Sequence, residues 1–220
     1  GGGVRISGTS VRSCSIHDNQ AICGGGIHNS FGDSWIDRCT VVSNLALWWG
    51  KGGGLYLSYG GGFIANTLIA QNEGGAGGGI AAELSRFSAI HCTIAHNTAP
   101  KGAGVYHYMT APSYTNTIIS HNIGEETVTD NGTINPAPPQ KYVFTEPGLD
   151  VVFQDVPRGN FRLRWDSPGI NAGTNLPDSL DTIDLDGKPR ILDGTADRGA
   201  YEQFPPNQDS DSDGLPDEWE

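Results

Sequence analysis

A six-residue segment that ends in asparagine recurs five times in the first 122 residues, and it limits the fold more than any other feature. Its copies occupy residues 14–19, 39–44, 67–72, 92–97 and 117–122, so the asparagines are 25, 28, 25 and 25 residues apart. A second block, a triplet of small residues followed by Val, Ile or Leu, occupies residues 1–4, 24–27, 52–55, 77–80 and 102–105. A fixed period of this length is typical of solenoids.

Each repeat holds two short strand patterns joined by glycine turns, and 32 of the 220 residues are glycine. One such unit cannot bury a hydrophobic face, but stacked units can, because each coil adds a parallel strand about 4.8 Å from the last. We therefore predict an all-β solenoid, a parallel β-helix with coils of about 25 residues, over residues 1–126. The expected core ladders are Ile16, Val41, Ile69, Ile94 and Ile119, and Val4, Ile27, Leu55, Ile80 and Val105.

The asparagines at the segment ends are expected to lie at a turn. Asparagine tolerates the left-handed backbone conformation, and its side-chain amide can bond the equivalent residue of the next coil. A leucine-rich-repeat solenoid is the main alternative. It requires a Leu-rich period of roughly 20–29 residues with a helical return, and these coils lack that helical pattern.

Charge is unevenly distributed along the chain, whose net charge is −12. Residues 1–126 carry six Lys/Arg and seven Asp/Glu, whereas residues 127–220 carry seven and eighteen. The basic surface that nucleic-acid binding requires is therefore absent, and the clustered carboxylates favour bound divalent cations or solvated loops. No run of about 18 apolar residues is present to span a membrane.

The repeats resemble those of bacterial polymorphic-outer-membrane-protein-type β-helices. Two downstream stretches, residues 161–174 (FRLRWDSPGINAGT) and 184–202 (DLDGKPRILDGTADRGAYE), resemble the C-terminal end of the bacterial choice-of-anchor Q proteins. The resemblance covers nearly the whole chain. It implies a right-handed helix, export and display at the bacterial cell surface, and it implies no established reaction.

The repeat pattern fades after residue 126. We expect residues 127–204 to form the last irregular coils and a C-terminal cap over the open end of the solenoid. Asp184, Asp186, Asp193 and Asp197 lie in Asp-Gly turns or beside them, where their side chains are expected to bond the backbone, and Arg198 is expected to pair with one of them. Residues 205–208 (PPNQ) are predicted to form a short stiff linker.

The last twelve residues, 209–220 (DSDSDGLPDEWE), fit the calcium-loop pattern D-x-D-x-D-G-x5-E. Asp209, Asp211, Asp213 and Glu220 would supply side-chain oxygens, which a hard cation such as Ca²⁺ requires, and Gly214 would allow the sharp turn. The segment resembles the calcium loops of bacterial thrombospondin type-3-like repeats. The alternative is an acidic tail that only increases solubility.

Surface aromatic residues are the best candidates for ligand binding. In the second strand pattern, Tyr56 and Tyr106 are expected to point outward, two coils and about 10 Å apart. Trp48 and Trp49 lie in the coil that is three residues longer than its neighbours. Aromatic faces stack on sugar rings, so these four residues predict a glycan-binding or adhesive surface; the alternative for the tryptophans is packing against the coils.

No catalytic residue is assigned. The expected function is glycan or surface binding by a secreted or cell-surface protein, and extracellular polysaccharide is the expected partner. The alternatives are a polysaccharide lyase, a glycoside hydrolase and a structural spacer. A hydrolase needs two carboxylates roughly 5–9.5 Å apart, and no such pair is apparent in the repeats.

His96 and His121 occupy the same position in adjacent coils, where a polar turn ladder is the expected role.

Cysteines are expected to be free thiols that point inward. Cys14 and Cys39 fall at one position in adjacent coils, within reach of a disulfide, but a thiol ladder is the favoured interpretation. Cys92 lies two coils from Cys39 and is too distant to bridge.

Overall fold

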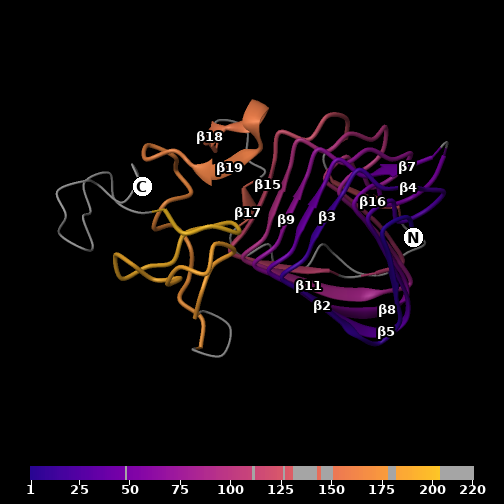
Figure 1. Ribbon diagram of the computed structural model, residues 1–220, viewed down its shortest axis with the longest axis horizontal. Helices are drawn as coiled ribbons and strands as arrows, with labels where there is room; N and C mark the ends of the chain where they lie inside the picture. Colours follow the sequence, from indigo (N-terminus) through magenta and orange to yellow (C-terminus); the bar gives the residue numbers. More distant parts are fainter. Residues whose placement is uncertain are drawn as a thin grey trace.

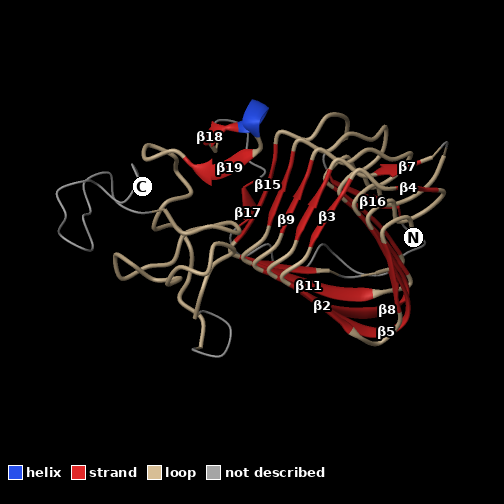
Figure 2. Cartoon of the chain, viewed as in Figure 1, coloured by secondary structure: helices blue, strands red, loops and turns tan. Residues whose placement is uncertain are grey.

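The chain folds as the parallel β-helix that the repeat predicts (Figure 1). The computed structural model describes residues 1–47, 49–110, 112–125, 151–177 and 182–203, and the backbone of two further strands at 127–130 and 143–144. Strands stack in parallel coil upon coil, and the regular part of the chain is strand and turn, with one short 3₁₀ helix outside the coils (Figure 2).

The coils have three faces, which we call the first, second and third sheets, where the sequence pattern indicated two strands per period. The first two are parts of one nine-stranded sheet that is continuous through two long, bent strands. The first sheet contains β1 (Val4–Ile6), the first part of β5 (Ile27–Asp37) and of β8 (Leu55–Ala65), β10 (Ile80–Glu83), β13 (Val105–Tyr108) and β16 (Thr127–Asp130). The second sheet contains β2 (Ser10–Arg12), the second part of β5 and β8, β11 (Arg86–Ile90) and β14 (Ser113–Thr115). The third contains β3 (Ser15–His17), β6 (Thr40–Val42), β9 (Leu68–Ala70), β12 (Thr93–Ala95), β15 (Thr117–Ser120) and β17 (Val143–Phe144).

The predicted core ladders are confirmed by the strand register. Ile69 lies beside Val41 in one neighbouring coil and beside Ile94 in the other. Ile80 likewise lies between Leu55 and Val105. Apart from Val4, which is partly buried in the first coil, the members of both ladders are buried. The hydrophobic driving force is therefore distributed evenly along the axis.

The asparagine ladder forms continuous hydrogen bonds through the coils. The Asn44 Nδ2 atom donates to Asn72 Oδ1 over 3.0 Å, and Asn72 repeats the bond to Asn97. Each of these asparagines also donates to a backbone carbonyl of the preceding coil, as Asn72 does to Val41 over 2.9 Å. The predicted amide ladder is thus confirmed.

The left-handed backbone conformation falls one residue earlier than predicted, on the residue before each asparagine. These residues are Asp18, Ser43, Gln71, His96 and His121. A second left-handed row, at the corner between the second and third sheets, contains Ser13, Arg38, Asn66, His91 and Asn116. The third, between the first and second sheets, differs in kind because it contains Phe31, Tyr59, Leu84 and Met109. Large side chains are uncommon in this conformation, and three of these four are well exposed.

The three extra residues of the second coil are confined to one corner. A short parallel pair, β4 (Gln20–Ala21) and β7 (Leu45–Ala46), precedes this corner. Leu45 bridges to Glu73, 28 residues later, whereas Lys51 bridges to Ala76, 25 residues later. The insertion therefore lies between Leu45 and Lys51, and the coil returns to register at once.

Residues 151–203 pack along the side of the solenoid, not over its open end as the expected cap would. This segment contains β18 (Phe153–Asp155), a 3₁₀ helix (Val156–Arg158) and β19 (Asn160–Leu163), and Figure 1 shows it in orange and yellow beside β15 and β17. Phe161 and Leu163 form a second hydrophobic core with Leu68 and Ile118, which point outward from the third sheet. The C-terminal segment therefore covers the outer face of that sheet.

Buried polar groups fasten the C-terminal segment to the coils. The Arg190 guanidinium is fully buried and donates to Asn66 Oδ1 over 2.7 Å, and it lies 3.9 Å from the Glu202 carboxylate. Asp184 accepts backbone N–H groups of Lys188 and Glu202, as the predicted turn role requires. Burial and the neighbouring Asp197 raise the pKa of Glu202 to about 8.

Two further predictions from the sequence concern Arg198 and the cysteines. The Arg198 Nε atom donates to the Ala172 carbonyl oxygen over 2.7 Å, and its pairing with an aspartate stays a prediction. All four cysteines are free thiols, as predicted, but only Cys39 and Cys92 are buried, whereas Cys14 is exposed. In the part of the chain that is described, no helix has the length and apolar character needed to cross a membrane.

Candidate functional site

Tyr56 lies on the outer face of the first sheet within a closed polar cluster. Its Oη atom donates to Glu83 Oε2 over 2.7 Å, and Glu83 also forms an ion pair with Lys51. Burial, together with this carboxylate, raises the pKa of Tyr56. The hydroxyl and the two charges already satisfy one another, so this cluster stabilises the sheet and leaves few polar groups for a ligand.

The neighbours of Tyr56 in its outward row are also unsuited to open binding. Tyr106 was expected on the surface, but it is buried, with 6% of its surface exposed. The intervening Ala81 is fully buried. His28 packs its ring 4.9 Å from that of Tyr56, and burial lowers its pKa to about 4, so His28 is neutral at physiological pH. The tyrosine row is therefore not the exposed platform that the sequence predicted.

Trp49 is highly exposed, with 87% of its surface accessible. It lies in the insertion between Leu45 and Lys51, as predicted, and it remains available to a ligand. Trp48 lies outside the described residues.

The outer face of the second sheet carries an arrangement that the sequence analysis missed. One outward row runs along the solenoid axis through five coils: Ser10, Trp35, Phe63, Ser88 and Ser113. We call it the aromatic row. The rings of Trp35 and Phe63 lie 5.3 Å apart, and Phe63 is 43% exposed. Beyond them, Ser113 donates to Ser88 over 2.6 Å. The row offers two adjacent aromatic rings followed by hydroxyls.

Two hollows flank the aromatic row. One, of about 390 Å³, is lined by Asp33, Gly62, Phe63, Arg86, Phe87, Ser88 and Ser113. The other, of about 290 Å³, is lined by Arg12, Trp35, Asp37, Arg38, Ala65, Asn66, Thr182 and Ile183. Glycine is required at position 61, beneath Asp33, because a Cβ atom there would lie 2.8 Å from Asp33 Oδ1 and 2.2 Å from the Arg86 carbonyl oxygen. Its small size lets the Asp33 carboxylate lie over the sheet beside the rings.

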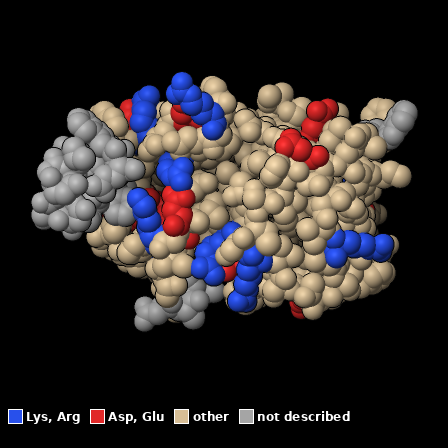
Figure 3. All heavy atoms as spheres, viewed as in Figure 1, with Lys and Arg blue, Asp and Glu red and all other residues tan. Residues whose placement is uncertain are grey.

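Charged groups surround the rings on both sides. The Arg12 guanidinium carbon lies 5.5 Å from the centroid of the Trp35 ring, a cation–π contact. Arg38 Nε lies 3.2 Å from Asp37 Oδ2, and Asn66 donates to the other oxygen of Asp37 over 3.4 Å. In the view of Figure 3, much of the coil surface is uncharged, and charged side chains gather over the C-terminal segment and beside it.

The aromatic row left no clear signal in the sequence because its five members do not repeat one residue type: three are serine and two are aromatic. The one available clue was the alternation of outward residues along 33–37, in which Asp33, Trp35 and Asp37 alternate with buried Ser34 and Ile36. That strand follows the glycine-led block directly, and no second repeated motif marks where the chain bends into the second sheet.

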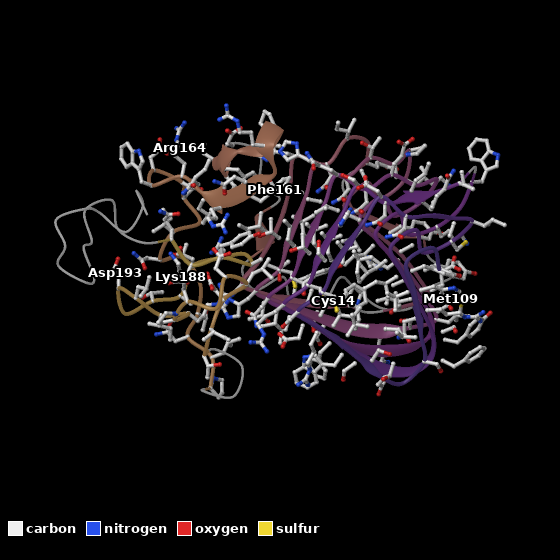
Figure 4. The ribbon with its side chains drawn as sticks, viewed as in Figure 1. Cys14, Met109, Phe161, Arg164, Lys188 and Asp193 are labelled. Carbon is white, nitrogen blue, oxygen red and sulfur yellow. The ribbon has the colours of Figure 1, made fainter. Side chains whose placement is uncertain are left out.

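The two stacked histidines have a structural role. The His96 and His121 rings lie 5.2 Å apart and nearly parallel, as expected for one position in adjacent coils. Phe161 packs 5.9 Å from His96, and Phe153 packs 5.9 Å from His121. Figure 4 places Phe161 in the C-terminal segment beside the coils, on the side opposite Met109. These rings therefore belong to the packing of the segment against the coils.

The predicted calcium ligands Asp209, Asp211, Asp213 and Glu220 lie outside the described residues. Among the residues that are described, no group of three or more His, Cys, Asp or Glu side chains is arranged to hold a metal ion. Comparison with protein-family models, curated proteins and solved structures found no match for this chain. The aromatic row is therefore interpreted from its own chemistry.

Proposed function

We propose that this protein binds an extracellular glycan on the outer face of the second sheet. The observation that carries the proposal is the pair of adjacent rings, Trp35 and Phe63, on one outward row between two hollows. Sugar rings present flat apolar faces that stack on aromatic side chains, with hydroxyls at the edges for polar groups. Asp33, Ser88 and the nearby arginines supply those groups here.

The geometry favours binding over hydrolysis by the acidic residues of this face. Asp33 and Asp37 both point outward from β5, four residues apart, which separates their α-carbons by about 13 Å. A hydrolase pair needs carboxylates roughly 5–9.5 Å apart. We therefore propose a binding protein, secreted or displayed at the bacterial surface as the resemblance implies.

Glycan-array and polysaccharide pull-down measurements test this proposal. The variant Phe63→Ala should lose binding while its circular dichroism spectrum and melting temperature stay close to those of the wild type, because Phe63 is exposed. Trp35→Ala should act in the same direction. Trp165→Ala, which removes a tryptophan that is 65% exposed on the C-terminal segment, serves as the matched control. Wild-type binding that persists in both aromatic-row variants would place the glycan elsewhere, and Trp49→Ala then becomes the next test.

We also propose that residues 209–220 bind Ca²⁺, on the strength of their spacing alone. Carboxylates at positions 1, 3, 5 and 12 with glycine at position 6 match the oxygen-ligand requirement of the ion. Isothermal titration of the whole chain with CaCl₂ should show one site that Asp209→Asn with Asp213→Asn abolishes. Unchanged heats in that double variant would identify the segment as a solubilising tail.

A further inference from the structure

Arginines outside the aromatic face mostly have a carboxylate partner. Arg158, Arg162 and Arg164 form ion pairs with Asp155, Asp186 and Asp166, and Arg190 faces Glu202. On the aromatic face, Arg38 is paired with Asp37. Two other arginines of that face, Arg12 and Arg86, are exposed and form no ion pair or hydrogen bond through their side chains with the described residues. The chain has 25 Asp and Glu residues and 13 Lys and Arg residues, so it has enough carboxylates to pair with every arginine.

These two arginines lie at opposite ends of the ring pair. Arg12 is in the first coil, Trp35 and Phe63 are in the second and third, and Arg86 is in the fourth. Arg12 lies two residues from the aromatic row on the side of Asp37, and Arg86 lies two residues from it on the side of Asp33. A guanidinium, two rings and a second guanidinium therefore cross four successive coils obliquely, over about 14 Å along the axis at the spacing of parallel strands. This length accommodates several linked sugars rather than one.

We propose that the glycan is an acidic polysaccharide that crosses the aromatic row obliquely, with its anionic groups paired to Arg12 and Arg86 and its sugar rings stacked on Trp35 and Phe63. This inference rests on the proposed function and names its ligand class. The guanidinium group forms bidentate hydrogen bonds with carboxylate or sulfate oxygens, so either anion satisfies the site.

The charges of the face agree with an anionic ligand. Three arginines and two aspartates lie there, so the face carries a positive net charge within a chain of net charge −12. Asp37 is neutralised locally by Arg38. Asp33 has no cationic partner among the described residues, and its carboxylate can accept hydroxyls of a sugar lying on Phe63.

The Trp35 indole supports the same assignment. Its Nε1 atom is buried and has no hydrogen-bond acceptor among the described residues. The Arg12 guanidinium lies over the same ring. An anionic group paired with Arg12 would therefore lie beside the Trp35 ring.

A three-polymer comparison on the whole chain tests the proposal. The probes are polygalacturonate, the same polymer after carboxyl reduction to a neutral galactan, and dextran sulfate. The wild type should bind polygalacturonate or dextran sulfate at least about tenfold more tightly than the neutral polymer at low salt. The preference should shrink in about 1 M NaCl, where charges are screened beyond roughly 3 Å. The better of the two charged polymers identifies the anionic group.

Two glutamine variants complete the test. Arg12→Gln and Arg86→Gln should each reduce the preference for the charged polymer, and the double variant should bind charged and neutral polymers alike. Arg158→Gln, a change at an exposed ion-paired site, is the control and should keep the preference. Equal wild-type affinity for charged and neutral polymers overturns the acidic-ligand inference and leaves glycan binding standing. Binding to none of the three, together with a negative glycan array, overturns the proposed function itself.

Discussion

The side-chain amide of Asn44 donates to the side-chain oxygen of Asn72 across 3.0 Å, although the two residues are 28 positions apart. The same oxygen of Asn72 accepts the backbone N–H of Asn44 over 2.9 Å. Asn72 is almost fully buried, so water cannot replace these bonds if the side chain is removed. The ladder therefore contributes to stability at every coil it passes through.

Replacing Asn72 with alanine should destabilise the protein by about 2 kcal/mol or more, because the truncation leaves the buried amide groups of Asn44 without their acceptor. Urea denaturation followed by circular dichroism measures the loss in the free energy of unfolding. Gln71→Ala is the matched control, since that side chain is exposed one residue earlier, and it should change stability little. Equal effects from the two variants would contradict a structural role for the ladder.

Glu202 should make the stability of the protein depend on pH. Its pKa is raised to about 8 in the folded state, chiefly by burial, so the folded protein holds this proton more tightly than the unfolded chain. The associated stability is complete below the unfolded pKa of roughly 4.3 and is lost as pH rises toward 8. Glu202→Gln should therefore be more stable than the wild type at pH 8 and similar at low pH, as thermal melts across this range would reveal. A parallel pH dependence in both proteins would count against it.

Phe161 should be the main apolar anchor of the C-terminal segment. It is almost fully buried, and its ring lies 5.5 Å from that of Phe153. Phe161→Ala should cost about 3–5 kcal/mol and increase proteolysis of residues 151–203, because the outward Leu68 and Ile118 lose their cover. Trp165→Ala in the same segment should leave the proteolysis rate unchanged. A Phe161→Ala protein as protease-resistant as the wild type would show that the polar contacts alone hold the segment.

Thiol labelling should separate the four cysteines. Burial raises the pKa of Cys92 to about 12 and also raises that of Cys39, so neither forms a reactive thiolate at pH 8. Cys14 is exposed and Cys23 partly exposed, so both should react with iodoacetamide in the native protein. Mass spectrometry after labelling with and without denaturant gives the count. Rapid native modification of Cys92 would mean that the core opens at that coil.

The coils could be predicted from the sequence because their chemistry repeats. Asn72 and Ile69 have equivalents in every coil, so one interpretation explains five segments together. The second sheet was missed for the opposite reason: Trp35 lies beside Phe63, Phe63 lies beside Ser88, and a row that changes from ring to hydroxyl carries no period. The binding function that we propose lies in that variable row, where the solenoid fixes the position of each residue but not its type.

The lateral packing of the C-terminal segment had a sequence signal that was not used. A strand exposed to water on one face should alternate apolar and polar residues. In the third sheet, Leu68 and Ala70 flank Ile69, and Thr93 and Ala95 flank Ile94, so both faces of these strands are largely apolar. Such strands require cover on the outside as well as the inside. What covers them could not be read from the sequence, because residues 151–203 have no repeat to align with the coils.

The insertion that carries Trp49 changes the length of one winding without disturbing those above and below it. Hydrogen-bonded bridges at Leu45 and Lys51 restore the strand pairing on both sides of the insertion. The stacking of the coils therefore does not depend on the residues that the insertion contains. Segments of other lengths inserted between these two residues should therefore be tolerated without disturbing the neighbouring coils. The molecule thereby separates the parts that must stay constant from a corner that is free to diversify.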